Sequence, residues 1–342
     1  MNLKIQMLRG IAIVYICLLH STFMWSDKCR EIYFSHFDTA SGVELFFIIS
    51  GYFCMKKLSA MVEQNDYCRY LDYVKKRFFR LAPLIYFWGG AVTIIGYFNP
   101  ALYGEFKQLM YNFAGTILWI RNFQEINSPT QFGYFWAVSL QFQFFVIMAL
   151  LCFIAKNNKN VILTLFSTFV LLSFYRPGVL QCDYFRLDSL VLGALIYFFT
   201  TYVSSGTLEN IKKFNWCSNI FKLFSFYILL IILALGNKVL VGYPNFHYTV
   251  VSLLAGAIFL IAIYRPDVIS TGIDFLDQLL IKIGNYSYSI YVSHIILWWI
   301  GMDITTRIGI ESTFYKSVVM LLCMICGAYL SKKFIEDRNF FA

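Results

Sequence analysis

The chain has 342 residues, of which 59% are hydrophobic and only 14% are charged. Soluble domains carry about 25% charged residues, so this composition excludes an ordinary cytosolic enzyme, and the high apolar content excludes a disordered chain. A net charge of +9 would by itself suggest nucleic-acid binding, but the basic residues lie mostly in loops between apolar segments. We therefore predict an all-α, polytopic integral membrane protein that forms one continuous domain over residues 1–342.

The apolar segments predict about ten transmembrane helices, each near the ~20 residues that a bilayer requires. These segments are residues 8–26, 40–57, 79–98, 134–155, 161–175, 185–202, 221–241, 247–264, 284–301 and 314–332. The apolar stretch 108–120 has about half the required length, so we predict a short helix that lies along the interface or re-enters the membrane.

The basic residues indicate the orientation of these helices. Most of the 28 Lys and Arg residues fall on the side of the N-terminus, above all in the loop between the second and third predicted spans. By the positive-inside rule, and with an even number of spans, both termini are predicted to be cytoplasmic. No metal site is predicted, because the only C-x-x-C pair, Cys323 and Cys326, lies inside the last span without a second pair of ligands.

The first predicted span carries two polar residues, Arg9 and His20. Eleven residues make about three helical turns, so both side chains are expected on one face, about 16 Å apart. Arg9 would lie at the cytoplasmic interface and His20 near the middle of the membrane. A neutral histidine there is a good general base near neutral pH. The structural alternative is an arginine that reaches the interface and a hydrogen-bonded core histidine.

Other polar residues also fall inside or at the ends of predicted spans, where an unpaired charge is costly. Glu44 could orient His20, bind a hydroxyl group of a ligand or form a structural ion pair. Arg186 and Asp188 are two positions apart, so they do not face each other on a helix and are expected to have separate partners. His294, on an aromatic-rich segment, is typical of a hydrogen-bonded core residue.

These residues lie in segments that resemble the motifs of a known family. The Arg9-x10-His20 spacing resembles the signature of the membrane-bound acyltransferase-3 family, whose members acylate sugars and other hydroxyl acceptors. Further blocks follow in the family's order: 42–52 (GVELFFIISGY), 77–84 (RFFRLAPL), 135–144 (FWAVSLQFQF), 186–195 (RLDSLVLGAL), 283–294 (IGNYSYSIYVSH) and 331–336 (SKKFIE). The resemblance covers residues 8 to 336, which is nearly the whole chain.

The resemblance implies an O-acyltransferase of the bacterial cytoplasmic (inner) membrane. Its donor substrate would be acyl-CoA, usually acetyl-CoA, bound from the cytoplasm, and its acceptor a hydroxyl of a surface polysaccharide or lipid-linked glycan. No permanently bound cofactor and no nucleic-acid partner are expected. His20 would act as general base with Glu44 beside it. Arg9, Arg77 and Arg80 would bind the donor phosphates through bidentate guanidinium groups, although such basic residues also serve as contacts to anionic membrane lipid.

One position departs from the family pattern. Gln141 stands where many members have a glutamate, and an amide keeps the hydrogen bonds but cannot act as a carboxylate. We assign Gln141, Arg186, Asp188 and His294 to acceptor binding or to support of the site. The chain ends without the extracytoplasmic hydrolase-like domain of some relatives, so we expect the membrane domain to complete the transfer itself. The alternative function is a transporter or flippase of a lipid-linked glycan, although no repeat typical of transporters is evident.

Overall fold

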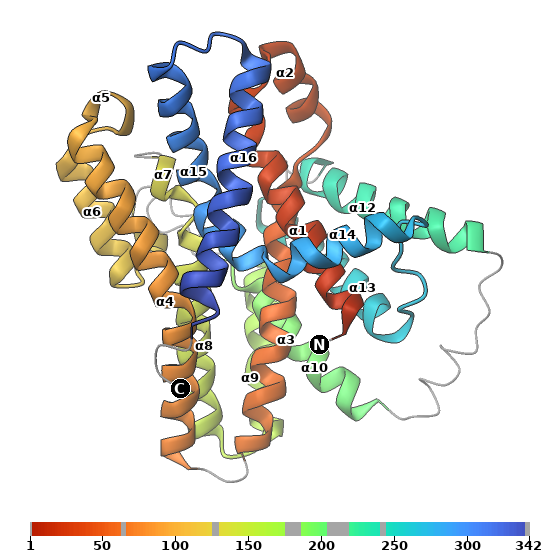
Figure 1. The fold of residues 1–342 in the computed structure, drawn as a ribbon. Coiled ribbons are helices and arrows are strands. Elements are labelled where there is room, and N and C mark those ends of the chain that lie inside the picture. The colour runs from red at the N-terminus through yellow and green to blue at the C-terminus, as the bar shows by residue number, and fades with distance from the viewer. Residues whose placement is uncertain are drawn as a thin grey trace. The chain divides into compact units, whose positions relative to one another are not determined.

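The computed structural model describes residues 2–62, 66–124, 130–174, 186–203, 219–239 and 244–338. These described residues are 87% helical and include no strand, which confirms the predicted all-α class (Figure 1). The chain divides into two compact units that alternate along the sequence. Unit 1 comprises Met1–Tyr70, Ile147–Arg176 and Arg186–Asn285, and unit 2 comprises Leu71–Val146, Pro177–Phe185 and Tyr286–Ala342. A single domain over the whole chain stays a prediction.

Six helical segments among the described residues are long and apolar enough to cross a membrane, which supports a multi-pass membrane protein. They are Leu3–Met24, Thr39–Val62, Tyr67–Phe98, Gln131–Ala155, His247–Tyr264 and Thr313–Glu336. The other four predicted spans are also helical. They correspond to α9 (Asn158–Phe174), α10 (Asp188–Tyr202), α12 (Asn219–Val239) and α15 (Ser287–Arg307). The number of ten spans therefore stays a prediction.

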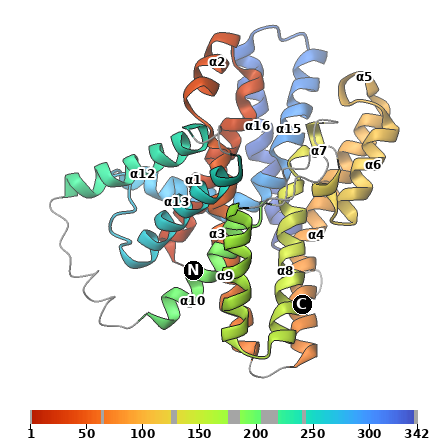
Figure 2. The same ribbon diagram turned by 180° about the vertical axis from the view of Figure 1, so that it is seen from behind.

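Most helices of unit 1 contribute to one apolar core. Besides α9, α10 and α12, the unit contains α1 (Leu3–Ser21), α2 (Asp27–His36), α3 (Gly42–Val62), α13 (Pro244–Tyr264) and α14 (Asp274–Asn285). The helices that contribute to the core are α1, α3, α10, α12, α13 and α14. Leu8, Leu45, Ile258 and Phe259 are fully buried in this core. Figure 2 shows α12 and α13 side by side, and these two helices are in contact.

Glycine residues allow two helix pairs of unit 1 to approach backbone to backbone. A Cβ atom on Gly10 of α1 would overlap the carbonyl oxygen of Leu280 in α14, and one on Gly284 would overlap that of Gln6. Figure 1 shows α14 crossing α1. Gly51 of α3 meets α10 in the same way. Small residues at such crossings are typical of membrane helices, because they let the helices pack closely without a hydrophobic driving force.

Unit 2 contains most of α4 (Tyr67–Phe98) and of α8 (Trp136–Ala155), the short helices α5 (Pro100–Tyr103) and α7 (Thr130–Gly133), α15 and α16 (Thr313–Ser331). A single π-helical turn, Lys332–Glu336, follows α16. Side-chain hydrogen bonds join these helices. The Trp88 indole donates to Ser331 Oγ at 2.9 Å, and the Tyr134 hydroxyl donates to the carbonyl oxygen of Val292 at 2.5 Å.

The half-length apolar stretch forms a short helix, as predicted. It is α6 (Phe106–Ile117), which has 12 residues. The chain turns at Trp119, whose φ of 59° lies in the left-handed region. The Trp119 indole donates to the Tyr86 hydroxyl at 3.1 Å, and the ring packs on Phe142 with 4.4 Å between centroids. Whether α6 lies at the interface or re-enters the membrane stays a prediction.

Candidate functional site

Helix α1 carries both Arg9 and His20, as the sequence predicts. Asn2 caps the N-terminus of the helix, because its side chain accepts a hydrogen bond from the Lys4 backbone N–H at 2.9 Å. Arg9 and His20 are both half-buried. The Arg9 guanidinium donates from Nη1 to Gln6 Oε1 at 3.4 Å, so its side chain lies along the first turns of α1.

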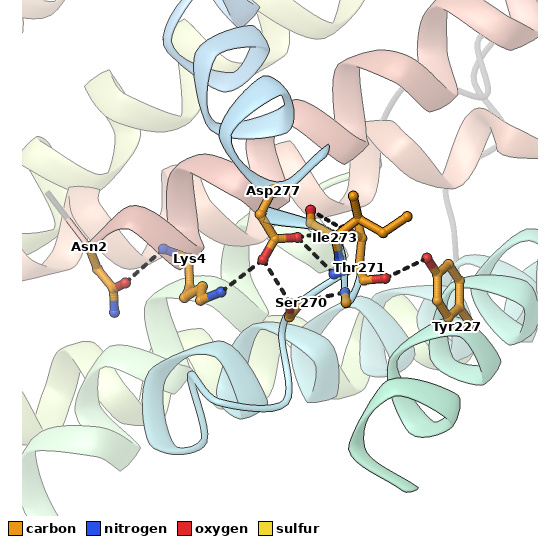
Figure 3. Close-up of polar contacts among 8 residues, drawn as sticks. Asn2, Lys4, Tyr227, Ser270, Thr271, Ile273 and Asp277 are labelled. Carbon is orange, nitrogen blue, oxygen red and sulfur yellow. Dashed lines mark hydrogen bonds and ion pairs between the residues drawn. The ribbon is translucent and has the colours of Figure 1, made fainter. Parts of the chain in front are cut away.

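The start of α1 is tied to the start of α14 by a cluster around Asp277 (Figure 3). Lys4 Nζ lies 3.5 Å from Asp277 Oδ2, which also accepts a hydrogen bond from Ser270 Oγ at 2.8 Å. Asp277 Oδ1 accepts from the backbone N–H of Thr271 at 2.7 Å and from its hydroxyl at 2.8 Å. The Tyr227 hydroxyl of α12 donates to the Thr271 carbonyl oxygen at 3.0 Å, so the cluster joins three helices.

These contacts also fix the charge state of Asp277. Partial burial acts to raise the pKa of Asp277, but the hydrogen bonds from Thr271 and Ser270 and the charge of Lys4 outweigh it. The pKa therefore lies below its ordinary value, and Asp277 is ionised near neutral pH. Together with the close crossing at Gly10, this ion pair holds α14 against the part of α1 that carries Arg9.

A second polar network joins the first turns of α3 and α10 to the first half of α13. Glu44 is 1% exposed, and both of its carboxylate oxygens are hydrogen-bonded. Oε1 accepts from Nη2 of Arg186, and Oε2 accepts from the hydroxyl of Ser189. Ser189 Oγ lies 2.6 Å from Ser252 Oγ, and the Arg186 guanidinium lies 4.2 Å from the centre of the Tyr248 ring. The structure thus brings Glu44 and Arg186 together as a buried ion pair.

Asp188 is buried in the same region but has a different partner. Its Oδ1 accepts a hydrogen bond from the Thr249 hydroxyl of α13 at 3.0 Å. The prediction that Arg186 and Asp188 have separate partners is confirmed. Glu44 and Asp188 each lie in the first turn of their helix, where the positive end of the helix dipole stabilises a carboxylate.

The segment that follows His20 is anchored back onto α1. The Tyr33 hydroxyl of α2 is hydrogen-bonded to Thr39 Oγ1, and Thr39 Oγ1 donates to the Tyr15 carbonyl oxygen at 2.8 Å. Burial raises the pKa of Tyr33, although the hydrogen bonds with Thr39 act in the opposite direction. Tyr33 therefore stays protonated over the physiological range. These bonds fix the position of α2 relative to the second half of α1.

Arg77 and Arg80 of α4 differ in their surroundings. Arg80 is exposed, whereas Arg77 is half-buried. The Arg77 guanidinium lies 5.2 Å from the centre of the Tyr73 ring and 5.0 Å from that of Phe145 in α8. No motif or spacing in the sequence indicates a role for Tyr73 or Phe145. Only the fold shows that they surround the first arginine of the R-x-x-R motif.

Gln141 lies half-buried in α8. The amide network of this helix is formed by Gln143, two residues after Gln141. Gln143 Nε2 donates to Asn122 Oδ1 at 2.8 Å and to the Trp119 carbonyl oxygen at 2.6 Å, and Asn122 Nδ2 donates back to Gln143 Oε1 at 3.2 Å. Arg121, beside Asn122, is fully buried. The sequence does not indicate this network. Gln143 lies in the apolar helix α8, and the short segment that carries Arg121 and Asn122 meets it only in the fold.

His294 of α15 is fully buried. Its Nδ1 lies 2.8 Å from the Tyr291 carbonyl oxygen, and because a carbonyl only accepts, Nδ1 carries the proton. The ring packs edge-on against Tyr134 at 5.0 Å and Trp298 at 5.3 Å. This is the hydrogen-bonded core histidine expected from the sequence.

The structure assigns each candidate residue to one unit. Unit 1 holds Arg9, His20, Glu44, Arg186 and Asp188, and unit 2 holds Arg77, Arg80, Gln141 and His294. Among the described residues, no group of three or more His, Cys, Asp or Glu side chains could hold a metal ion.

Comparison with known proteins gives a consistent result. The acyltransferase-domain model of the acyltransferase-3 family matches residues 2–332. A stretch of 195 residues is 26% identical to the peptidoglycan O-acetyltransferase OatA of Listeria monocytogenes serovar 1/2a (strain ATCC BAA-679 / EGD-e) and covers 51% of this chain and 29% of that protein. The matched region thus spans less than a third of the relative's length. No solved structure matches the chain.

Proposed function

Because the chain belongs to the acyltransferase-3 family, we propose that it is a membrane-embedded O-acyltransferase. It transfers an acetyl or other short acyl group from acyl-CoA, on the cytoplasmic side, to a hydroxyl of a surface polysaccharide or lipid-linked glycan. The observation that carries the proposal is the family match over residues 2–332, on a chain whose first helix holds Arg9 and His20 in the family spacing. The similarity to a peptidoglycan O-acetyltransferase supports a glycan acceptor. We place the protein in the bacterial cytoplasmic membrane, with both termini in the cytoplasm.

In this proposal His20 accepts the proton of the acceptor hydroxyl as its oxygen attacks the thioester carbonyl carbon. A new C–O bond forms and the C–S bond breaks. The CoA thiolate leaves and takes up the proton that His20 holds, so the histidine returns to its neutral form. General-base assistance of this kind accelerates a reaction by about 10²–10⁴-fold.

Glu44 is assigned a positioning role beside this base. Both of its oxygens already accept hydrogen bonds, from Arg186 and Ser189, so the carboxylate holds α3 and α10 together. Thr249 donates a hydrogen bond to Asp188 in the same region and so joins α13 to α10. On the acceptor side, Arg186 and Asp188 therefore support the site through the helices that they fix.

Donor binding is assigned to the three arginines. Arg9, Arg77 and Arg80 supply guanidinium groups, which bind phosphate in a bidentate way that lysine cannot match. Gln141 and His294 are assigned to support of the site in unit 2. No cofactor is required besides the acyl-CoA substrate.

The test is acyl transfer by the His20→Ala variant in isolated membranes, with radiolabelled acetyl-CoA as donor, followed by structural analysis of the surface glycan from cells with and without the protein. His36→Ala is the matched control, because His36 lies exposed on α2. We expect His20→Ala to lose transfer and His36→Ala to retain it, with both proteins inserted in the membrane. Full transfer by His20→Ala would contradict the role of the base. An unchanged glycan without the protein, together with altered glycan export, would favour a flippase.

A further inference from the structure

Two aromatic rings enclose the guanidinium group of Arg77 in unit 2. Tyr73 lies one turn earlier on α4, at the i, i+4 spacing that places side chains next to each other. Phe145 comes from α8. The ring centres lie 5.2 Å (Tyr73) and 5.0 Å (Phe145) from the guanidinium carbon, and 6.4 Å from each other with the rings nearly perpendicular. Both distances to Arg77 fall within the ~6 Å range of a cation–π interaction.

The two rings are buried whereas the arginine between them is partly accessible, as a ligand-binding residue must be. Tyr73 is 4% exposed and Phe145 is 3% exposed, so the rings are fixed by packing. Arg77 itself is only half-buried, so part of its side chain is accessible. Within the described part of the chain, no carboxylate forms an ion pair with Arg77. Among these described residues, the contacts to its guanidinium group therefore come from rings and not from an acid.

We infer that Tyr73 and Phe145 are positioning residues for the acyl donor, which hold the Arg77 guanidinium ready to bind a CoA phosphate. This inference rests on the proposed function, since it requires Arg77 to bind the donor. A guanidinium that packs on aromatic rings keeps the N–H groups in its plane available for bidentate contact with phosphate. A side chain that is ordered before the ligand arrives loses less conformational entropy on binding. The exposed Arg80, one turn further along α4, has no such restraint from burial.

The test is the binding of coenzyme A to the detergent-purified full chain, measured by calorimetry, together with the melting temperature of each variant. Phe145→Leu removes one ring and should weaken binding by about 2- to 30-fold, the range that one cation–π contact supplies. Phe145→Tyr keeps a ring and should restore binding. Phe144→Leu is the matched control, because Phe144 is equally buried on the same helix but its ring does not contact Arg77.

A double-mutant cycle separates positioning from general destabilisation. In an Arg77→Ala background, Phe145→Leu should cause no further loss of coenzyme A binding, because the residue acts only through Arg77. Tyr73→Leu, in the same cycle, gives an independent measurement if Phe145→Leu does not fold.

The outcomes distinguish this inference from the proposed function. If Arg77→Ala weakens coenzyme A binding while Phe145→Leu and Tyr73→Leu do not, the positioning role is wrong and the donor site stands. An equal loss from Phe145→Leu with and without Arg77 would also overturn it, in favour of a purely structural role. If Arg77→Ala leaves binding unchanged, the donor role of Arg77 fails and the inference fails with it.

Discussion

Glu44 and Arg186 are 142 positions apart in the chain, yet they form a buried ion pair between α3 and the residues that precede α10. Both residues are buried from water, since Glu44 is 1% and Arg186 is 7% exposed. Each group therefore depends on the other for the stabilisation that water would otherwise supply. We therefore expect the stability of unit 1 to depend on this pair.

Removal of one partner should be strongly destabilising. Glu44→Ala leaves the Arg186 guanidinium buried without its carboxylate, and breaking such a pair costs about 3–5 kcal/mol. We expect a clear fall in melting temperature of the purified protein. Asp27→Ala, which breaks the exposed pair with Arg30, serves as control and should change stability by less than about 1 kcal/mol. A Glu44→Ala variant as stable as this control would show that the buried pair is not required.

The close approach of α1 and α14 predicts a marked difference between two glycine substitutions. Gly10→Ala places a methyl group against the Leu280 carbonyl oxygen, which belongs to the backbone and cannot rotate away. Overpacking of this kind costs about 1–3 kcal/mol. Gly90→Ala, in α4, meets only the Phe113 ring at 3.6 Å and should be neutral or stabilising by up to about 1 kcal/mol. Thermal unfolding of both variants tests this. Equal melting temperatures would mean that α1 and α14 are not in backbone contact.

The Asp277 cluster predicts a dependence of stability on pH. The folded-state pKa of Asp277 lies below its unfolded value, which is about 3.9. The stabilisation is therefore fully present well above pH 4 and is lost as the pH falls through the unfolded pKa toward the lower folded one. Asp277→Asn should be less stable than the unsubstituted protein at pH 7 and should lose less stability between pH 6 and pH 3. Parallel melting curves for the two proteins over this range would contradict the assignment.

The sequence predicted what depends on composition and local spacing. Apolar runs predicted membrane helices, and the eleven-residue spacing placed Arg9 and His20 on one helix, which α1 confirms. The i, i+2 spacing correctly predicted separate partners for Arg186 and Asp188. The half-length stretch 108–120 correctly predicted a short helix, because its length is a local property.

Contacts between distant segments could not be predicted from one sequence. Ser189 and Ser252 belong to the Glu44 network only because α10 packs against α13. Likewise Phe145 lies against Arg77 because of the way α8 packs in unit 2. Serine and phenylalanine are common in the apolar helices of membrane proteins. Their presence in the sequence therefore does not indicate which residues they will contact.

The last prediction separates a donor site from a set of basic residues that only orient the protein in the membrane. If Arg9, Arg77 and Arg80 bind CoA phosphates, Arg→Lys at each should weaken donor binding although the charge is kept. Lysine supplies a point charge without the planar fork, so a loss of about 2 kcal/mol, or roughly 30-fold, is expected from each. The measurement is the Michaelis constant for acetyl-CoA in isolated membranes, which should rise while the acceptor dependence changes little.

The matched controls for this series are Lys75→Arg and Lys76→Arg. Both lysines are exposed on α4, close to Arg77, so they share the local charge without a phosphate contact assigned to them. Their Michaelis constants should change by less than about fivefold relative to the unsubstituted enzyme, because exposed charges contribute less than about 1 kcal/mol. If Arg and Lys are interchangeable at all five positions, the basic residues act as a topology signal. The phosphates of the donor must then bind to other residues of the chain.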